Sequence, residues 1–184
     1  MSKQSAINMQ KLANIIKNDG LAVVPTDTIY GIVALASSKV ATEKVFALKG
    51  RTLSKPPIVL ITSLDQMFSA PPKLALKTLK KYWPGPNSII LPDANAPSWI
   101  TRGTGTVAYR MISSDIDLYA LITQTGPLIA PSANPEGLPP AKNIAQAKEY
   151  FGDQIDFYLD GGETTDTAPS NLYLWSKDGM KQLR

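Results

Sequence analysis

The sequence predicts an α/β (α+β) fold in which a twisted sheet of mixed parallel and antiparallel strands is flanked by helices. Three observations favour it. Short apolar runs of strand length alternate loosely with stretches of helical periodicity. Several of these runs follow one another closely enough to pair antiparallel, which argues against a strictly parallel sheet. The 15 prolines in 184 residues gather at loops such as Pro84-Gly85-Pro86, so the breaks between elements are well marked.

Helices are expected where apolar residues recur on one helical face. The first carries Met9 and Ile16 on that face and meets Gly20 at its C-terminal end, a position that glycine favours. The second has Ser38 as its N-cap and Gly50 as its stop. The predicted helices are Ser5–Asp19, about Lys39–Lys49, Lys73–Lys81, Asp115–Thr125 and Lys142–Phe151.

Strands are expected at the short apolar runs between these helices, because such runs bounded by turn residues suit a buried sheet. The first run is followed by Pro25 and by Thr26–Gly31, whose small hydroxyls and glycine predict a turn. No repeat or long linker divides the chain, so we expect residues 1–184 to form one domain. The predicted strands are Leu21–Val24, Ile58–Ile61, Ser88–Leu91, Thr106–Met111, Leu128–Ala130, Phe157–Leu159 and Leu172–Trp175.

The composition excludes several kinds of chemistry. The chain has no cysteine and no histidine, which excludes disulfides, thiolate metal sites, cysteine nucleophiles and the commonest general base. Any catalysis must then depend on positioning and electrostatics. No stretch approaches the roughly 20 apolar residues of a membrane span, and the N-terminus lacks the apolar core of a secretory signal. We therefore expect a cytoplasmic protein with no membrane partner.

Two cations, Lys49 and Arg51, surround Gly50 at the predicted end of a helix. They suit a phosphate clamp, since arginine offers a planar fork and lysine a compact charge. The first 60 residues carry eight Lys or Arg against three Asp or Glu, so this basic part of the chain is the better candidate for an anion site. The alternative is that the two cations only complement the helix dipole.

Ser132 and Asn134 follow the predicted strand Leu128–Ala130. Ligands of open α/β sheets bind at the carboxyl ends of strands, and alternate residues of an extended segment point the same way. One hydroxyl and one amide would therefore face a phosphate or a ribose together. The alternative is an ordinary polar turn completed by Pro135 and Gly137.

Two further groups of residues suit a ligand. The segment Thr26–Gly31 crowds hydroxyls and a carboxylate beside a buried strand, which favours binding over a simple strand cap. Thr106 and Arg110 share one face of another predicted strand. A buried Arg110 needs a partner, either a carboxylate such as Asp27 or Asp115 or the carboxylate of a substrate. The spacing leaves both possibilities open.

Neither a P-loop nor a Gly-x-Gly-x-x-Gly motif occurs. Lys49-Gly50-Arg51, followed far downstream by Ser132-Ala133-Asn134, resembles instead the YrdC-like family of L-threonylcarbamoyladenylate synthases. The likeness runs from Leu21 to about Ser170, so it covers nearly the whole chain, which is similar to the short, single-domain form of the family. The segments that carry it, in order, are PTDTIYG, LKGR, KPPIVLI, YWPGPNSIILP, GTVAYR, APSANPEGLPPAKN, DGG and a later APS.

The resemblance implies a YrdC-like sheet with a concave basic groove and a nucleotidyltransferase activity. The enzyme would condense L-threonine, bicarbonate and ATP to threonylcarbamoyl-AMP and pyrophosphate, for the N6-threonylcarbamoyl modification of adenosine 37 in tRNA. By this resemblance Lys49 and Arg51 would be catalytic. The residues implied for ATP are Lys49, Arg51, Ser88, Thr106, Ser132 and Asn134, and those for threonine are Thr28, Tyr30 and Arg110. Mg²⁺ would arrive on ATP without a metal ligand from the protein, and transferase proteins of tRNA modification would be downstream partners.

A function of another class also fits the composition. A sequence pI of about 9.2 and a basic concave face suit a non-enzymatic module that binds double-stranded RNA. The one tight basic patch in the sequence, Lys77, Lys80 and Lys81, is equally explained by a solvated helix face. A second alternative, the carbamoyl-adenylate-forming domain of hydrogenase-maturation proteins, usually occurs in longer chains with zinc-binding cysteines, which this sequence lacks.

Overall fold

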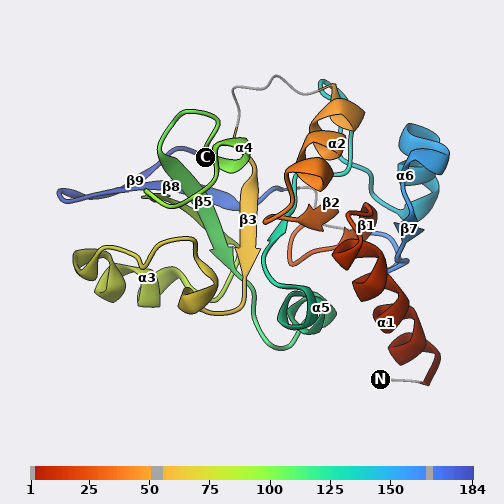
Figure 1. Cartoon of the computed structure of the whole chain (residues 1–184), viewed down its shortest axis with the longest axis horizontal. Coiled ribbons are helices and arrows are strands. Elements are labelled where there is room, and N and C mark those ends of the chain that lie inside the picture. Colours follow the sequence, from red (N-terminus) through yellow and green to blue (C-terminus); the bar gives the residue numbers. More distant parts are fainter. Residues whose placement is uncertain (1–2, 51–55, 165–167) are drawn as a thin grey trace.

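The computed structural model describes residues 3–50, 56–164 and 168–184, and one mixed sheet runs through its centre (Figure 1). Within these residues nine strands pair in the order β7-β1-β2-β6-β3-β5-β4-β8-β9. Their bounds are β1 Ala22–Pro25, β2 Tyr30–Leu35, β3 Ile58–Ile61, β4 Asn87–Pro92, β5 Thr106–Met111, β6 Leu128–Ile129, β7 Phe157–Tyr158, β8 Asn171–Ser176 and β9 Gly179–Gln182.

Both parallel and antiparallel pairs occur in this sheet, which confirms the predicted fold class. β1 and β7, β3 and β5, and β4 and β8 pair in parallel, whereas the other neighbours are antiparallel. β3 and β5 are joined by a long connection, as parallel strands require. The register sets Leu60 of β3 opposite Arg110 of β5.

Helices cover both faces of the sheet and divide its core into two clusters. On one face, Val45 of α2, Leu79 of α3 and Phe151 of α6 pack against the sheet. On the other, α1 and α5 pack together over β2, β3 and β6. The helices are α1 Lys3–Lys17, α2 Lys39–Lys49, α3 Leu76–Tyr82, α4 Ser98–Thr101, α5 Asp117–Thr125 and α6 Ile144–Phe151, with short 3-10 turns at Leu64–Gln66, Lys73–Ala75 and Gly152–Gln154.

Strand alternation decides which way the side chains of β5 face. Val107 and Tyr109 belong to the cluster under α2, α3 and α6. Because successive side chains point to opposite faces, Thr106, Ala108 and Arg110 point to the other face. The sequence prediction that Thr106 and Arg110 share a face is therefore confirmed.

The caps of α2 explain why this helix ends at Lys49. The Ser38 hydroxyl accepts a hydrogen bond from the Ala41 N–H at 3.1 Å. At the other end Gly50 is left-handed, with φ at 59°, and its N–H reaches the Ala47 carbonyl. Both predicted caps are confirmed, and they fix Lys49 as the last residue of the helix.

Some elements differ from the sequence prediction. Tyr30 and Gly31 were expected in a turn, but they open β2, since they pair with Pro25 and Val24 of β1 and leave a turn of only four residues between the strands. No strand was predicted at β2, and neither α4 nor β9 was predicted. At the end of α1 the left-handed residue is Asp19, with φ at 61°, and not Gly20. Glycine is needed at position 20 for space, because a Cβ there would lie 2.4 Å from the Ile15 side chain.

Candidate functional site

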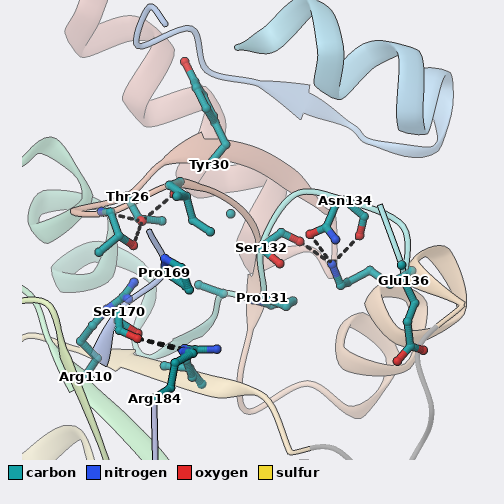
Figure 2. A pocket seen from close by; sticks show the side chains of 17 residues that line it. Thr26, Tyr30, Arg110, Pro131, Ser132, Asn134, Glu136, Pro169, Ser170 and Arg184 are labelled. Carbon is teal, nitrogen blue, oxygen red and sulfur yellow. Dashed lines mark hydrogen bonds between the residues drawn. The ribbon is translucent and has the colours of Figure 1, made fainter. Parts of the chain in front are cut away.

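A cavity of about 240 Å³ opens where strand ends meet the C-terminus of α2 (Figure 2). It brings together segments that are far apart in the sequence: the β1–β2 turn, the end of α2, one residue each from β3 and β5, the loop after β6, the segment before β8 and the last residue of the chain. Its lining consists of Thr26, Thr28, Ile29, Tyr30, Gly31, Lys49, Ile58, Arg110, Ala130, Pro131, Ser132, Asn134, Glu136, Gly137, Pro169, Ser170 and Arg184.

Main-chain hydrogen bonds hold the loop after β6 against β2. The Ile32 N–H donates to the Pro131 carbonyl at 2.9 Å, and the Ala133 N–H donates to the Tyr30 carbonyl at 2.8 Å. A Cβ at Gly31 would lie 3.1 Å from the Thr26 methyl group and 3.4 Å from the Pro131 carbonyl oxygen, so glycine leaves room where the turn and the loop meet β2. The β1–β2 turn and the polar loop that contains Ser132 therefore share one wall of the cavity.

Lys49 is tied to this loop and is only 5% exposed. Its ammonium group donates to the main-chain carbonyls of Ser132 and Asn134, and lies 3.4 Å from the Asn134 side-chain oxygen. An ammonium group has three hydrogens, and these three protein oxygens can accept all of them. The structure thus brings together Lys49, Ser132 and Asn134 as predicted, but with the lysine charge directed at the loop itself.

The two polar side chains of the loop have different surroundings. The Asn134 amide nitrogen donates to the carbonyls of Pro135 and Leu138, at 2.9 and 2.6 Å, so this side chain is occupied in shaping its own loop. The Ser132 hydroxyl has no hydrogen-bond partner in the part of the chain that the structure describes. Of the two, Ser132 is the one that can offer its side chain to a ligand.

Arg110 reaches the cavity from β5, with its side chain only 4% exposed. One terminal nitrogen lies 3.0 Å from the Asp27 carboxylate. Burial lowers the pKa of Arg110, Asp27 opposes that change, and nearby Arg184 adds to it. Asp27 does not line the cavity, so the carboxylate supports the guanidinium from behind. Of the partners left open by the sequence, Asp27 is confirmed, and a substrate carboxylate stays a prediction.

Arg184 and Ser170 are site residues that the sequence analysis did not predict. The β8–β9 hairpin returns the last residue to the start of β8, where the Leu172 N–H donates to the Arg184 carbonyl at 3.1 Å. The guanidinium of Arg184 then donates twice to the Ser170 carbonyl, at 3.2 and 3.0 Å. Figure 2 shows Arg184 and Ser170 beside Arg110. No local pattern marks a terminal arginine, because its place depends on the hairpin.

The β1–β2 turn supplies two hydroxyl groups to the cavity, those of Thr26 and Thr28. Thr28 lines it, as predicted for a ligand contact. Tyr30 also belongs to the wall, but its ring points away from the other labelled side chains (Figure 2). Its hydroxyl donates to the Gly162 carbonyl at 2.7 Å and accepts from the Gly161 N–H at 2.9 Å. Tyr30 therefore anchors the segment 161–162 against β2.

Two other predicted residues, Ser88 and Thr106, are not among the described residues that line the cavity. Ser88 is fully buried and lies behind the lining, with its hydroxyl 2.9 Å from that of Ser170. Thr106 is at the opposite end of β5 from Arg110 and contacts the Thr104 hydroxyl at 3.0 Å. Arg51 lies outside the described residues.

The charges in the lining suit an anionic ligand that also carries polar groups. The cavity has cations on two sides, Lys49 on one and Arg110 with Arg184 on the other, and Glu136 is the carboxylate in its lining. Such groups can neutralise phosphate or carboxylate charge and hold it in a fixed geometry. Among the described residues, no group of three acidic side chains is placed to hold a metal ion, and no helix is long and apolar enough to cross a membrane.

Comparisons with known proteins find relatives that cover most of this chain. A threonylcarbamoyl-AMP synthase of Pyrococcus abyssi is 36% identical over 156 residues, which are 83% of this chain and 46% of that protein. A threonylcarbamoyl-AMP synthase of Cellvibrio japonicus is 31% identical over 164 residues, 87% of each chain. The chain thus spans about half the length of the archaeal relative but most of the bacterial one. None of these relatives favours the RNA-binding alternative.

Solved structures extend the agreement to the fold. The crystal structure of P. abyssi Sua5 with L-threonine superposes with a TM-score of 0.86 at 33% identity, over 96% of this chain and 53% of that one. Escherichia coli YciO superposes with a TM-score of 0.85 at 20% identity, over 100% and 90%, which bears on the fold alone. The family model named Sua5, YciO and YrdC, described as "telomere recombination", matches residues 14–184. The chain therefore belongs to the Sua5/YciO/YrdC family, as its motifs had indicated.

Proposed function

We propose that this chain is a threonylcarbamoyl-AMP synthase, which condenses L-threonine, bicarbonate and ATP and releases pyrophosphate. The observation that carries the proposal is the meeting of Arg110 and Arg184 with the Ser132–Asn134 loop around one cavity. A site for this reaction must hold a carboxylate and a triphosphate side by side, and this cavity has cations on both sides. Relatives named for the activity, 31 to 36% identical over more than 80% of the chain, support it.

Threonine is proposed to bind at the Arg110 side of the cavity. A guanidinium can hold a carboxylate through two parallel hydrogen bonds, and the contact of Arg110 with Asp27 involves only one terminal nitrogen. Thr28 faces the same space from the β1–β2 turn and offers a hydroxyl. Tyr30 supports this wall from behind through Gly161 and Gly162.

ATP is proposed to bind from the Lys49 side of the cavity across to Arg184. Ser132 offers its hydroxyl, Lys49 contributes charge at short range, and Arg184 offers a second guanidinium. Arg51 keeps its proposed role in this group on the strength of the Lys-x-Arg motif. Ser88 would act through Ser170, and Thr106 would reach a nucleotide that extends along β5. Asn134 would act by shaping the loop.

The chemistry that these residues can serve needs no histidine or cysteine. The neutral threonine amine adds to carbon dioxide with loss of a proton, or to bicarbonate with loss of water, and forms a carbamate. A carbamate oxygen then attacks the α-phosphorus as pyrophosphate leaves. The protein aligns the two reactants and neutralises the negative charge that develops on the phosphate oxygens. Arg110 holds threonine in place, while Lys49, Arg51 and Arg184 stabilise the triphosphate.

Magnesium is proposed to enter as part of the nucleotide. Mg²⁺ commonly binds through substrate phosphates and one or two carboxylates while it keeps several waters. Glu136 is the carboxylate in the cavity lining, so the donor set fits a metal ion carried by ATP. When bound, the ion would withdraw negative charge from the phosphates. As a separate proposal, the product threonylcarbamoyl-AMP would pass to transferase proteins of tRNA modification.

Incubation of the purified protein with ATP, bicarbonate and each of several amino acids tests the proposal. Mass spectrometry should detect threonylcarbamoyl-AMP when threonine is present, and pyrophosphate release should depend on both threonine and bicarbonate. The control is the same mixture without bicarbonate. Absence of a threonine-specific product at every magnesium concentration and pH would contradict the proposal. Tight binding of duplex RNA without turnover would support the RNA-binding alternative instead.

A further inference from the structure

The β1–β2 turn contains two threonine hydroxyls, those of Thr26 and Thr28, and both residues line the cavity. Their oxygens lie 3.2 Å apart, within the hydrogen-bonded group around Thr26 in Figure 2. Thr28 is the residue proposed above to contact the amino acid, whereas Thr26 has no role in that proposal. The hydrogen bonds around Thr26 nevertheless decide how the Thr28 hydroxyl is oriented.

The single hydroxyl hydrogen of Thr26 is committed to the protein. Its oxygen lies 2.7 Å from the Ile29 carbonyl, and the carbonyl can only accept. The same hydroxyl oxygen accepts a hydrogen bond from the Thr28 N–H at 3.2 Å. Thr26 therefore has no hydrogen left to donate to the Thr28 side chain.

It follows that Thr28 is the donor in the contact between the two hydroxyls. A hydroxyl has one hydrogen and two acceptor lone pairs. With its hydrogen directed at Thr26, the Thr28 oxygen retains its lone pairs for the cavity. The group that the turn presents to a ligand is thus an acceptor, although a threonine side chain by itself can serve as donor or acceptor.

We propose that Thr26 is a positioning residue that determines specificity, because it makes the Thr28 hydroxyl an acceptor only. The cavity would then select an amino acid that brings a hydroxyl hydrogen to this point. This inference rests on the proposed function and adds the physical basis of its amino-acid choice. L-valine has nearly the shape of threonine without the hydroxyl, and O-methyl-L-threonine keeps the oxygen but has no hydrogen on it.

Calorimetric titration of the wild-type protein with these three amino acids gives the first test. L-threonine should bind at least about tenfold more tightly than L-valine and O-methyl-L-threonine, since an unpaired acceptor in the cavity disfavours both analogues. If either analogue binds as tightly as threonine, the inference is overturned. This comparison needs no variant, so it can overturn the inference even where a substituted protein fails to fold.

Two substitutions at Thr26 give the second test. Thr26→Val removes the hydroxyl at nearly constant shape, while Thr26→Ser retains it as the matched control. With Thr26→Val the preference for threonine over valine should fall about tenfold, and the affinity for valine should change by less than about twofold. Thr26→Ser should keep the wild-type preference. Equal weakening of both amino acids by Thr26→Val would overturn the inference, because a structural role alone predicts that result.

The two proposals fail in different ways. If threonine binds with the expected preference but no threonylcarbamoyl-AMP forms with ATP and bicarbonate, the proposed function is wrong and the role of Thr26 in recognition stands. If the product forms but Thr26→Val leaves the preference for threonine unchanged, the proposed function stands and the role of Thr26 is wrong.

Discussion

The two sides of the cavity hold their cations in different ways. On the α2 side, the Lys49 ammonium group faces three oxygens of the loop Ser132–Asn134. On the β5 and β8 side, Arg110 contacts Asp27 through one terminal nitrogen, and Arg184 uses two nitrogens on a single carbonyl. A guanidinium has five N–H donors, so the arginine side retains donors in the described residues. Lys49 therefore lies at the cavity with its hydrogens directed at the loop, whereas the arginines have N–H donors left for a ligand.

This comparison assigns different kinds of work to the two sides. The Lys49 side sets the conformation of the cavity wall, because the ammonium group fixes the loop that presents Ser132. The arginine side contacts the ligand, because its remaining donors can pair with carboxylate or phosphate oxygens. Substitutions that separate protein stability from substrate affinity will test the distinction.

The largest effect is expected from Lys49→Met. The change leaves the carbonyls of Ser132 and Asn134 without their donor, so we expect a loss of about 2 kcal/mol in the free energy of unfolding. Catalytic efficiency with ATP should fall by about 10²–10³-fold as the loop loses its geometry. Urea titration and pyrophosphate release measure the two quantities.

Lys49→Arg is the matched control, because it keeps the charge but cannot point three hydrogens at one loop in the same way. We expect a partial loss of both stability and activity. A Lys49→Met protein with unchanged stability and lost activity would contradict the comparison, since it would mean that Lys49 serves the substrate alone and does not fix the loop.

The next largest effect is expected from Arg110→Gln. Threonine should bind about 30- to 100-fold more weakly, because a charge-assisted hydrogen bond to its carboxylate contributes roughly 2–3 kcal/mol. The variant should also lose about 3 kcal/mol of stability, because the Asp27 carboxylate stays buried without its partner. Calorimetric titration and urea unfolding distinguish the two losses.

A double substitution sharpens this result. Asp27→Asn combined with Arg110→Gln removes both charges of the buried pair, so most of the lost stability should return. Threonine affinity should stay as low as in the single variant. Recovery of affinity together with stability would show that Arg110 contributes to the fold and not to binding.

A smaller effect is expected from Arg184→Gln. The residue is at the end of the chain and its partner is one carbonyl, so stability should change by less than about 1 kcal/mol. The Michaelis constant for ATP should rise about tenfold through loss of a charged hydrogen bond, and Arg184→Lys should restore part of it. An unchanged Michaelis constant in steady-state assays would exclude Arg184 from the site.

The smallest effect is expected from Ser88→Ala. Ser88 contacts Ser170 and does not line the cavity, so its influence on a ligand is indirect. We expect a loss of about 1 kcal/mol in stability and a change of about twofold in the Michaelis constant for ATP. A change above tenfold without loss of stability would indicate direct contact with the nucleotide.

Much of this architecture could be predicted, because its causes are local. Ser38 and Gly50 act within one helical turn of the residues that they cap, so the limits of α2 were visible in the sequence. The runs at β3 and β5 were equally visible, since a buried strand needs apolar side chains wherever it lies in the sheet. The whole of β2 was missed, because a tyrosine and a glycine after two threonines are also typical of a turn.

The sequence by itself determined the class of fold, the caps, and the order of motifs that identifies the family. Only the tertiary structure decided what each polar residue does: that Lys49 is bound to its own loop, that Tyr30 faces away from the cavity, and that Arg184 enters it. The reason is that the role of a donor depends on which acceptor the fold places beside it. Lys49 and Ser132 are brought together by the packing of α2 and by the position of the loop after β6. No residue spacing encodes whether their atoms meet.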